Sequence, residues 1–143
     1  MKYVLLIYLC ALSCEDADKQ QVPASVLYLG IVVAGIYRIC KLAQGRGSPG
    51  ECLMAAVPGI LFLAISALTR QIGEADGLIL LIIGLASGLK ITWEVLFMSL
   101  LLSAIHSVGM LIKKGIRSMS FPFIPFLALS FGIISTVTKA IVL

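Results

Sequence analysis

The chain has 143 residues, of which 60% are hydrophobic and 13% are charged, and its mean hydropathy is +1.10. Soluble domains carry about 25% charged residues, so this composition excludes a water-exposed globular protein and indicates one whose solvent is lipid. The formal net charge of +4 is scattered, and without a long basic tract the chain does not fit the class of nucleic-acid-binding proteins.

Six apolar segments follow one another, each ended by charged residues, glycine or proline. We expect transmembrane helices over residues 1–14, 24–40, 52–69, 77–89, 91–112 and 121–143. The connections are too short for a second domain, so residues 1–143 are predicted to form one membrane-embedded domain, an all-α bundle of six transmembrane helices. The first segment also resembles a signal sequence, but Ala11 departs from a lipoprotein cleavage site, and we expect this segment to be retained.

The four cysteines do not predict a metal site, because no CxxC pair occurs and no histidine is near them in sequence. Cys40 and Cys52 flank one connection and would form a disulfide if it faced an oxidising compartment. We expect two reduced thiols there, and no metal or cofactor.

Asp16 and Asp76 each stand at the end of an apolar segment, where a carboxylate is costly. An even number of crossings separates them, so both should face the same side of the membrane. Asp16 lies about 15 residues from Met1 and Asp76 about 14 from Lys90, or roughly 21 Å of helix in each case, against a hydrocarbon core about 30 Å thick. Both are therefore expected at the same depth, just inside one interface.

Two carboxylates held close together cannot both ionise easily, so such a pair shares a proton. The ionised member can take a proton from water while the protonated member polarises a carbonyl, as in aspartic proteases. Alternatively, the two are separate interfacial acids that cap helices or pair with Lys19 and Arg70, and Asp18 is a rival of Asp16 for a catalytic role. Two other functional classes stay open: a small proton- or ion-coupled transporter component that uses the carboxylates as a relay, and a structural subunit of a secretion complex.

The sequence around these carboxylates resembles the type IV prepilin peptidase and preflagellin peptidase family of intramembrane aspartic proteases. That family has one Asp about seven residues before an Ile/Leu/Val-Pro pair and a second Asp in a Gly-x-Gly-Asp motif at the start of a later helix. Asp16 precedes Val22-Pro23 at this spacing. The second motif corresponds to Gly73-Glu74-Ala75-Asp76, with Ala75 in place of the second glycine.

A third segment is similar to the Pro-Phe-Gly-Pro-Phe-Leu-Ala sequence that opens the last helix of the family. In residues 121–128, Pro122 and Pro125 match its prolines and Ile124 stands where glycine is usual. Independently of the resemblance, prolines are tolerated in the first turn of a helix. The chain also has Leu78 where the family often has Lys two residues after the second Asp.

The resemblance implies an aspartic-type endopeptidase that needs no cofactor and removes a short basic leader from prepilin-like precursors, cutting after a glycine. The short form lacks the amino-terminal domain associated with methylation, so we expect cleavage without N-methylation, as in the peptidases of tight-adherence (Flp/Tad) pili. Basic residues barely distinguish the two membrane faces. The resemblance places the site at the cytoplasmic face of the cell membrane, with the amino terminus outside. The catalytic residues would be Asp16 and Asp76, with supporting roles for Asp18, Gly73, Glu74, Ala75, Pro23, Pro122 and Pro125.

Overall fold

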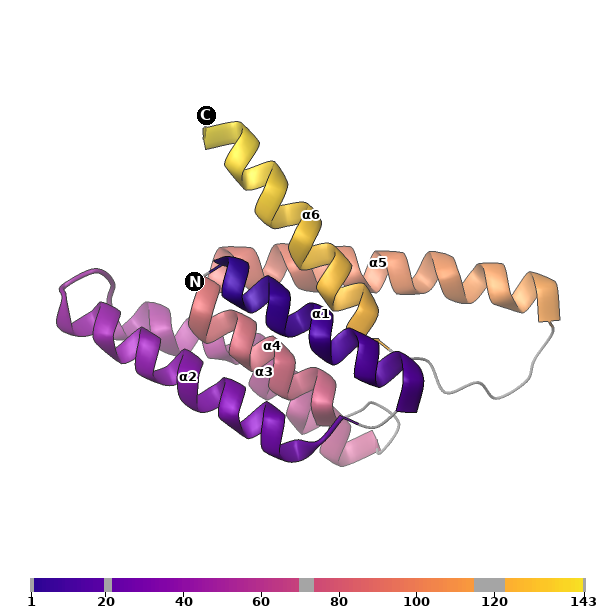
Figure 1. Cartoon of the computed structure of the whole chain (residues 1–143), viewed down its shortest axis with the longest axis horizontal. Coiled ribbons are helices and arrows are strands. Elements are labelled where there is room, and N and C mark those ends of the chain that lie inside the picture. The colour runs from indigo at the N-terminus through magenta and orange to yellow at the C-terminus, as the bar shows by residue number, and fades with distance from the viewer. Residues whose placement is uncertain (1, 20–21, 70–73, 115–122, 143) are drawn as a thin grey trace.

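The computed structural model describes residues 2–19, 22–69, 74–114 and 123–142, and the regular secondary structure of this part of the chain is entirely helical (Figure 1). The helices are α1 (Lys2–Lys19), α2 (Ala24–Ala43), α3 (Pro49–Thr69), α4 (Glu74–Ser87), α5 (Leu89–Lys114) and α6 (Ile124–Val142). The all-α prediction is confirmed. Within the described residues, three helices are long and apolar enough to cross a membrane, over Ala24–Ala43, Pro49–Leu68 and Leu89–Ile112. Six transmembrane spans remain a prediction.

Helix ends differ from the predicted ones where local hydrogen bonds extend a helix. α1 continues through the charged stretch after residue 14 to Lys19. α3 begins at Pro49 because Ser48 and Glu51 form a capping box. The N–H of Glu51 donates to Ser48 Oγ at 3.1 Å, and the N–H of Ser48 donates to Glu51 Oε2 at 3.5 Å. The Ser-x-x-Glu spacing was a sequence signal for this earlier start.

α4 and α5 are separated by Gly88 alone, whose φ of 92° is disfavoured for residues with a side chain. The predicted break at Lys90 was therefore two residues too late. Helix geometry gives the 14 residues of α4 a length of roughly 21 Å. This short helix is enclosed by contacts with α1, α2, α3 and α5. Its central position buries most of its side chains, including Ile79, Leu80 and Ile83.

Small residues let α3 and α4 approach each other closely, as is common between membrane helices. A Cβ atom at Gly84 would collide with the carbonyl oxygen of Ala55. On α3, a Cβ atom at Gly59 would lie 2.6 Å from the backbone nitrogen of Leu81. These backbone contacts leave no room for a side chain, so they fix the axial position of α4 relative to α3.

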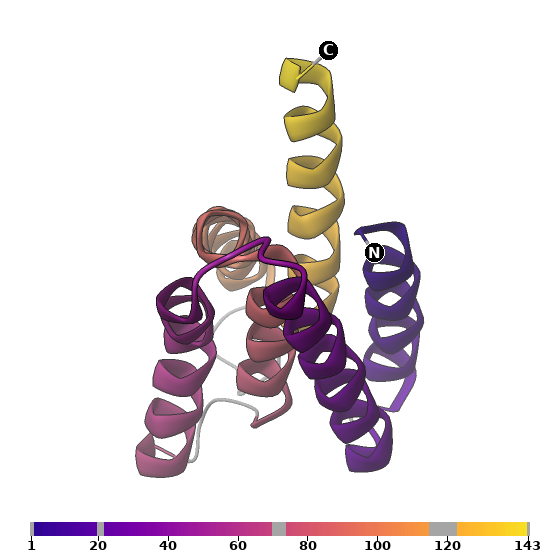
Figure 2. The same ribbon diagram turned by 90° about the vertical axis from the view of Figure 1, so that its left-hand side faces the viewer.

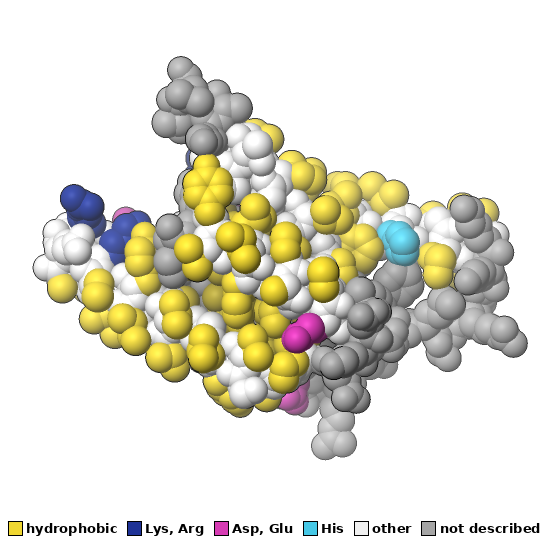
Figure 3. All heavy atoms as spheres, viewed as in Figure 1, with side chains coloured by type: hydrophobic (Ala, Val, Ile, Leu, Met, Phe, Trp, Pro, Cys, Tyr) yellow, Lys and Arg dark blue, Asp and Glu magenta, His cyan; other side chains and the backbone are white. Residues whose placement is uncertain are grey.

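The helices give the bundle two distinct ends (Figures 1 and 2). The carboxyl end of α1 and the amino ends of α4 and α6 lie at one end, while the α2–α3 turn and Gly88 lie at the other. Hydrophobic side chains are spread over the described part of the face seen in Figure 3. Exposed apolar side chains occur on α2, α3 and α5, the three helices that could cross a membrane, and also on α1 and α6. This surface suits a protein surrounded by lipid.

Candidate active site

Asp16 lies on the buried face of α1. Leu5, Leu9 and Leu12 are buried at helical spacing, and Asp16 takes the next position of the same stripe. Only 8% of its surface is exposed. The periodicity that directs the leucines into the core therefore also directs this carboxylate inward, against α4 and α6.

Asp76 is in the first turn of α4 and is 9% exposed. The residues that follow it, Gly77 and Ile79, are also buried, because the whole helix is enclosed by its neighbours. Neither aspartate belongs to a helix that could cross the membrane among those described. Both stand just beyond the apolar run of their own helix, at the same end of the bundle.

The two carboxyl groups influence each other. Burial and, to a smaller extent, the charge of Asp16 raise the pKa of Asp76 to about 7. Burial also raises the pKa of Asp16, but a hydrogen bond from the backbone N–H of Ile124 opposes this effect. The structure thus brings together the two carboxylates that the crossing count placed on one side. Near neutral pH the pair can hold one proton.

The donor to Asp16 belongs to the first turn of α6, where the first four N–H groups of a helix have no partner within the helix. Pro125 has no N–H, and the N–H groups of Phe126 and Leu127 both donate to the carbonyl of Phe123, at 3.1 and 3.2 Å. The N–H of Ile124 has no acceptor within the helix, and it donates to the carboxylate of Asp16.

This backbone donor was not predicted from the sequence. The third segment was assigned to the site through Pro122 and Pro125, and Ile124 entered only as a departure from glycine. The available signal was a proline at the second position of a helix, because this arrangement leaves the preceding amide as an unused donor.

The other predicted site residues are less closely tied to the pair. Glu74 is exposed, and Ala75 is half-buried against the hydrophobic core. Pro23 is exposed and precedes the first residue of α2, with φ −63° and ψ 122°. Pro125 is half-buried in the first turn of α6. Gly73 and Pro122 lie outside the described residues, as does the side chain of Asp18, whose backbone is part of the last turn of α1.

Two positions after the GEAD sequence clarify how this chain departs from the family pattern. Leu78, at the position of the usual Lys, packs against the hydrophobic core, so no cation stands there. Gly77, directly after Asp76, lies where α3 comes close, since a Cβ atom there would lie 2.8 Å from Cγ of Leu63 on α3. A small residue is therefore needed at this position.

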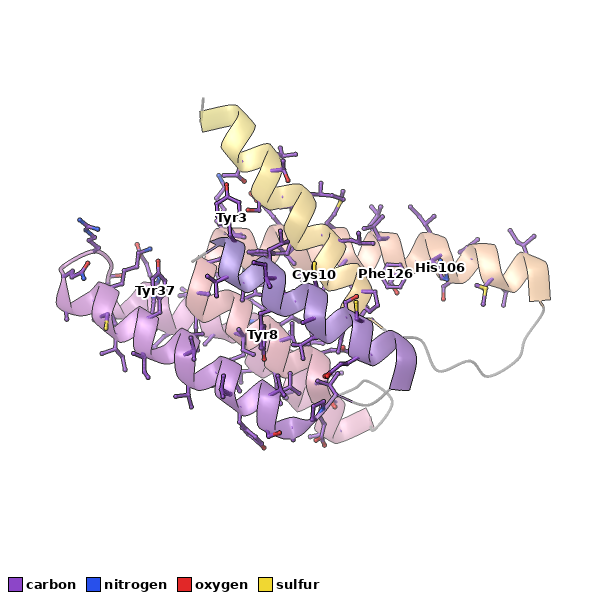
Figure 4. The ribbon with its side chains drawn as sticks, viewed as in Figure 1. Tyr3, Tyr8, Cys10, Tyr37, His106 and Phe126 are labelled. Atoms are coloured by element: carbon purple, nitrogen blue, oxygen red, sulfur yellow. The ribbon has the colours of Figure 1, made fainter. Side chains whose placement is uncertain are left out.

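Other reactive groups lie away from the pair or apart from one another. Among the described residues, no three His, Cys, Asp or Glu side chains are grouped so that they could hold a metal ion. All four cysteines are free, so Cys40 and Cys52 do not form a disulfide in this structure. His106 is exposed on α5, and its ring lies 5.4 Å from that of Phe126 on α6 (Figure 4).

Comparison with known proteins supports the resemblance noted in the sequence. The family model described as the type IV leader peptidase family matches residues 3–108, which is more than half of the chain. The matched stretch includes Asp16 and Asp76 and ends before α6. No curated protein and no solved structure matches the chain. From the extent of the family match, this chain belongs to the type IV leader peptidase family.

Proposed function

We propose that this protein is an aspartic endopeptidase that removes the leader peptide from a prepilin-like precursor. Membership of the leader peptidase family supports the peptidase activity. The observation that supports the aspartic type is the burial of Asp16 and Asp76, from separate helices, with the charge of one raising the pKa of the other. Such a pair is suited to acid–base chemistry on an amide.

The reaction requires one carboxylate and one carboxylic acid. The carboxylate removes a proton from water as the water oxygen bonds to the carbonyl carbon, and the acid gives its proton to the carbonyl oxygen. In the second step the C–N bond breaks, the leaving nitrogen takes the proton that came from water, and a hydroxyl proton of the intermediate returns to the second carboxylate. Each carboxyl group thereby regains its starting state.

The position of the pair supports cleavage near a membrane interface. Asp16 and Asp76 lie at one end of the bundle, beyond the apolar runs of their helices. Glu15 and Glu74, which are both exposed, lie beside them in sequence and would favour a basic leader electrostatically. Acidic side chains are visible near the carboxyl end of α1 in Figure 3. The proposal places this end at the cytoplasmic face and the amino terminus outside.

The finer description of the substrate comes from the sequence resemblance. We propose a Flp/Tad-type precursor with a short basic leader, a glycine at the cut and a hydrophobic helix, processed without N-methylation. Mass spectrometry of the product would test both points. It should give an amino terminus directly after the glycine and the mass of an unmodified α-amino group, whereas an added methyl group would contradict the proposal.

The test of the catalytic pair is co-expression of such a precursor with Asp16→Asn or Asp76→Asn. Each substitution keeps the side-chain shape and removes one ionisable group, and each should abolish leader removal. Glu74→Gln is the matched control, since it neutralises an exposed acid two residues from Asp76, and it should process normally. Asp18→Asn tests the rival residue. Full processing by Asp16→Asn or Asp76→Asn would refute the proposal.

A further inference from the structure

We infer that the amino end of α6 positions the catalytic pair: the backbone N–H of Ile124 binds the Asp16 carboxylate and keeps it ionised, so that Asp16 activates water and Asp76 carries the proton. This assignment rests on the proposed function and gives each carboxylate a separate role. Ile124 is a positioning residue here, because it acts through Asp16 and not on the substrate.

Ile124 offers Asp16 one directed hydrogen-bond donor. The neighbouring amides of the first turn of α6 are absent at Pro125 and engaged with the Phe123 carbonyl at Phe126. A single donor therefore faces Asp16, and it comes from the backbone of a helix, whose position does not depend on a side-chain rotamer. The positive end of the α6 dipole adds to the preference for negative charge at this point.

Asp16 needs this donor. More than nine-tenths of its surface is buried, and its Oδ2 atom is buried without a hydrogen-bond partner among the described residues. A buried carboxylate is destabilised unless hydrogen bonds compensate for lost water. The Ile124 amide supplies such a bond to Asp16.

The two carboxyl groups differ in their hydrogen-bond donors. Asp76 also lies in the first turn of a helix, so helix dipoles alone do not distinguish them. The difference is that the backbone N–H of Ile124 donates a hydrogen bond to Asp16, which stabilises the charged form of that carboxyl group. With one proton between them, the geometry favours its residence on Asp76.

Other titratable groups around Asp16 do not change this order. On α1, Glu15 is exposed, and the side chains of Asp18 and Lys19 lie outside the described residues. α4 contributes exposed Glu74 and buried Asp76, and the one titratable residue of α6, Lys139, is near its carboxyl end. Of these groups, Asp76 is the one whose pKa is altered by the Asp16 charge.

The test removes the donor without removing the helix. Ile124→Pro deletes the N–H at the first helical position, where proline is tolerated, and it keeps the preceding residue extended. Ile124→Ala is the matched control, because it loses the same buried side chain but keeps the N–H. The readout is the pH dependence of cleavage of a prepilin-like peptide by full-length protein in detergent.

We expect Ile124→Pro to move the acid limb of the profile to higher pH by about one unit, because the charged form of Asp16 loses a hydrogen bond. Ile124→Ala should leave this limb in place, even if it lowers the melting temperature. An amide-to-ester replacement at position 124 removes the N–H, keeps the side chain and should reproduce the shift if Ile124→Pro does not fold.

Equal acid limbs in the ester protein and the wild type would overturn the inference. If Asp16 and Asp76 are not the catalytic pair, the result is different, because Asp16→Asn and Asp76→Asn would then cleave the peptide like the wild type.

Discussion

Replacement of Asp76 by asparagine should change how the stability of the protein depends on pH. Asp76 is 9% exposed, and its pKa in the folded protein is about 7, compared with an ordinary value of 3.8. The folded state therefore holds a proton that the unfolded state releases over this range. The contribution of Asp76 to the free energy of unfolding is greatest below pH 3.8, falls as pH rises and becomes constant above about pH 7. Asp76→Asn cannot ionise and removes this contribution.

The size of the effect follows from the two pKa values. Each pH unit between them corresponds to about 1.36 kcal/mol, so the full difference amounts to roughly 4 kcal/mol. Between pH 5 and pH 7 the wild type should lose roughly 2 kcal/mol of unfolding free energy through Asp76. This loss corresponds to a fall of several degrees in melting temperature.

The assay is thermal unfolding of the purified protein in one detergent at pH 5, 6, 7 and 8. The wild type should melt at progressively lower temperature up to about pH 7, and Asp76→Asn should show a smaller decrease. Glu74→Gln is the control because it removes an exposed acid from the same helical turn, and it should follow the wild type. Equal pH dependence in Asp76→Asn and the wild type would show that Asp76 is not a buried group with a raised pKa.

Three further predictions concern packing and orientation. Gly84→Ala should lower the melting temperature, since its Cβ would collide with the α3 backbone, whereas Gly109→Ala, which has open space, should not; equal values would contradict this packing. Tyr8→Phe removes the 2.8 Å hydrogen bond to the Val26 carbonyl and should cost about 1 kcal/mol of unfolding free energy in denaturant titration, while an unchanged midpoint would argue against the bond. With Cys40 as sole cysteine, an impermeant maleimide should label intact cells, and labelling after lysis alone would reverse the proposed orientation.

The sequence by itself determined the class of protein and the positions of the two acids in its helices. A chain with 13% charged residues cannot cover a water-exposed surface, so helices in lipid follow from composition. The leucine spacing of α1 also predicts that Asp16 points inward, because Asp16 lies on the same helical face as the buried leucines. The sequence also predicts an even number of membrane crossings between the two acids, which would place Asp76 on the same side.

The tertiary structure alone decided which groups surround the pair. The amino-acid sequence does not reveal that the amide of Ile124 is the free donor of α6, or that the amino end of this helix lies against Asp16. It also does not reveal that Gly77, beside Asp76, lies in close contact with Leu63 of α3. Both depend on the axial position of one helix relative to another that is distant in sequence. That position is set by backbone packing between helices, which no local pattern specifies.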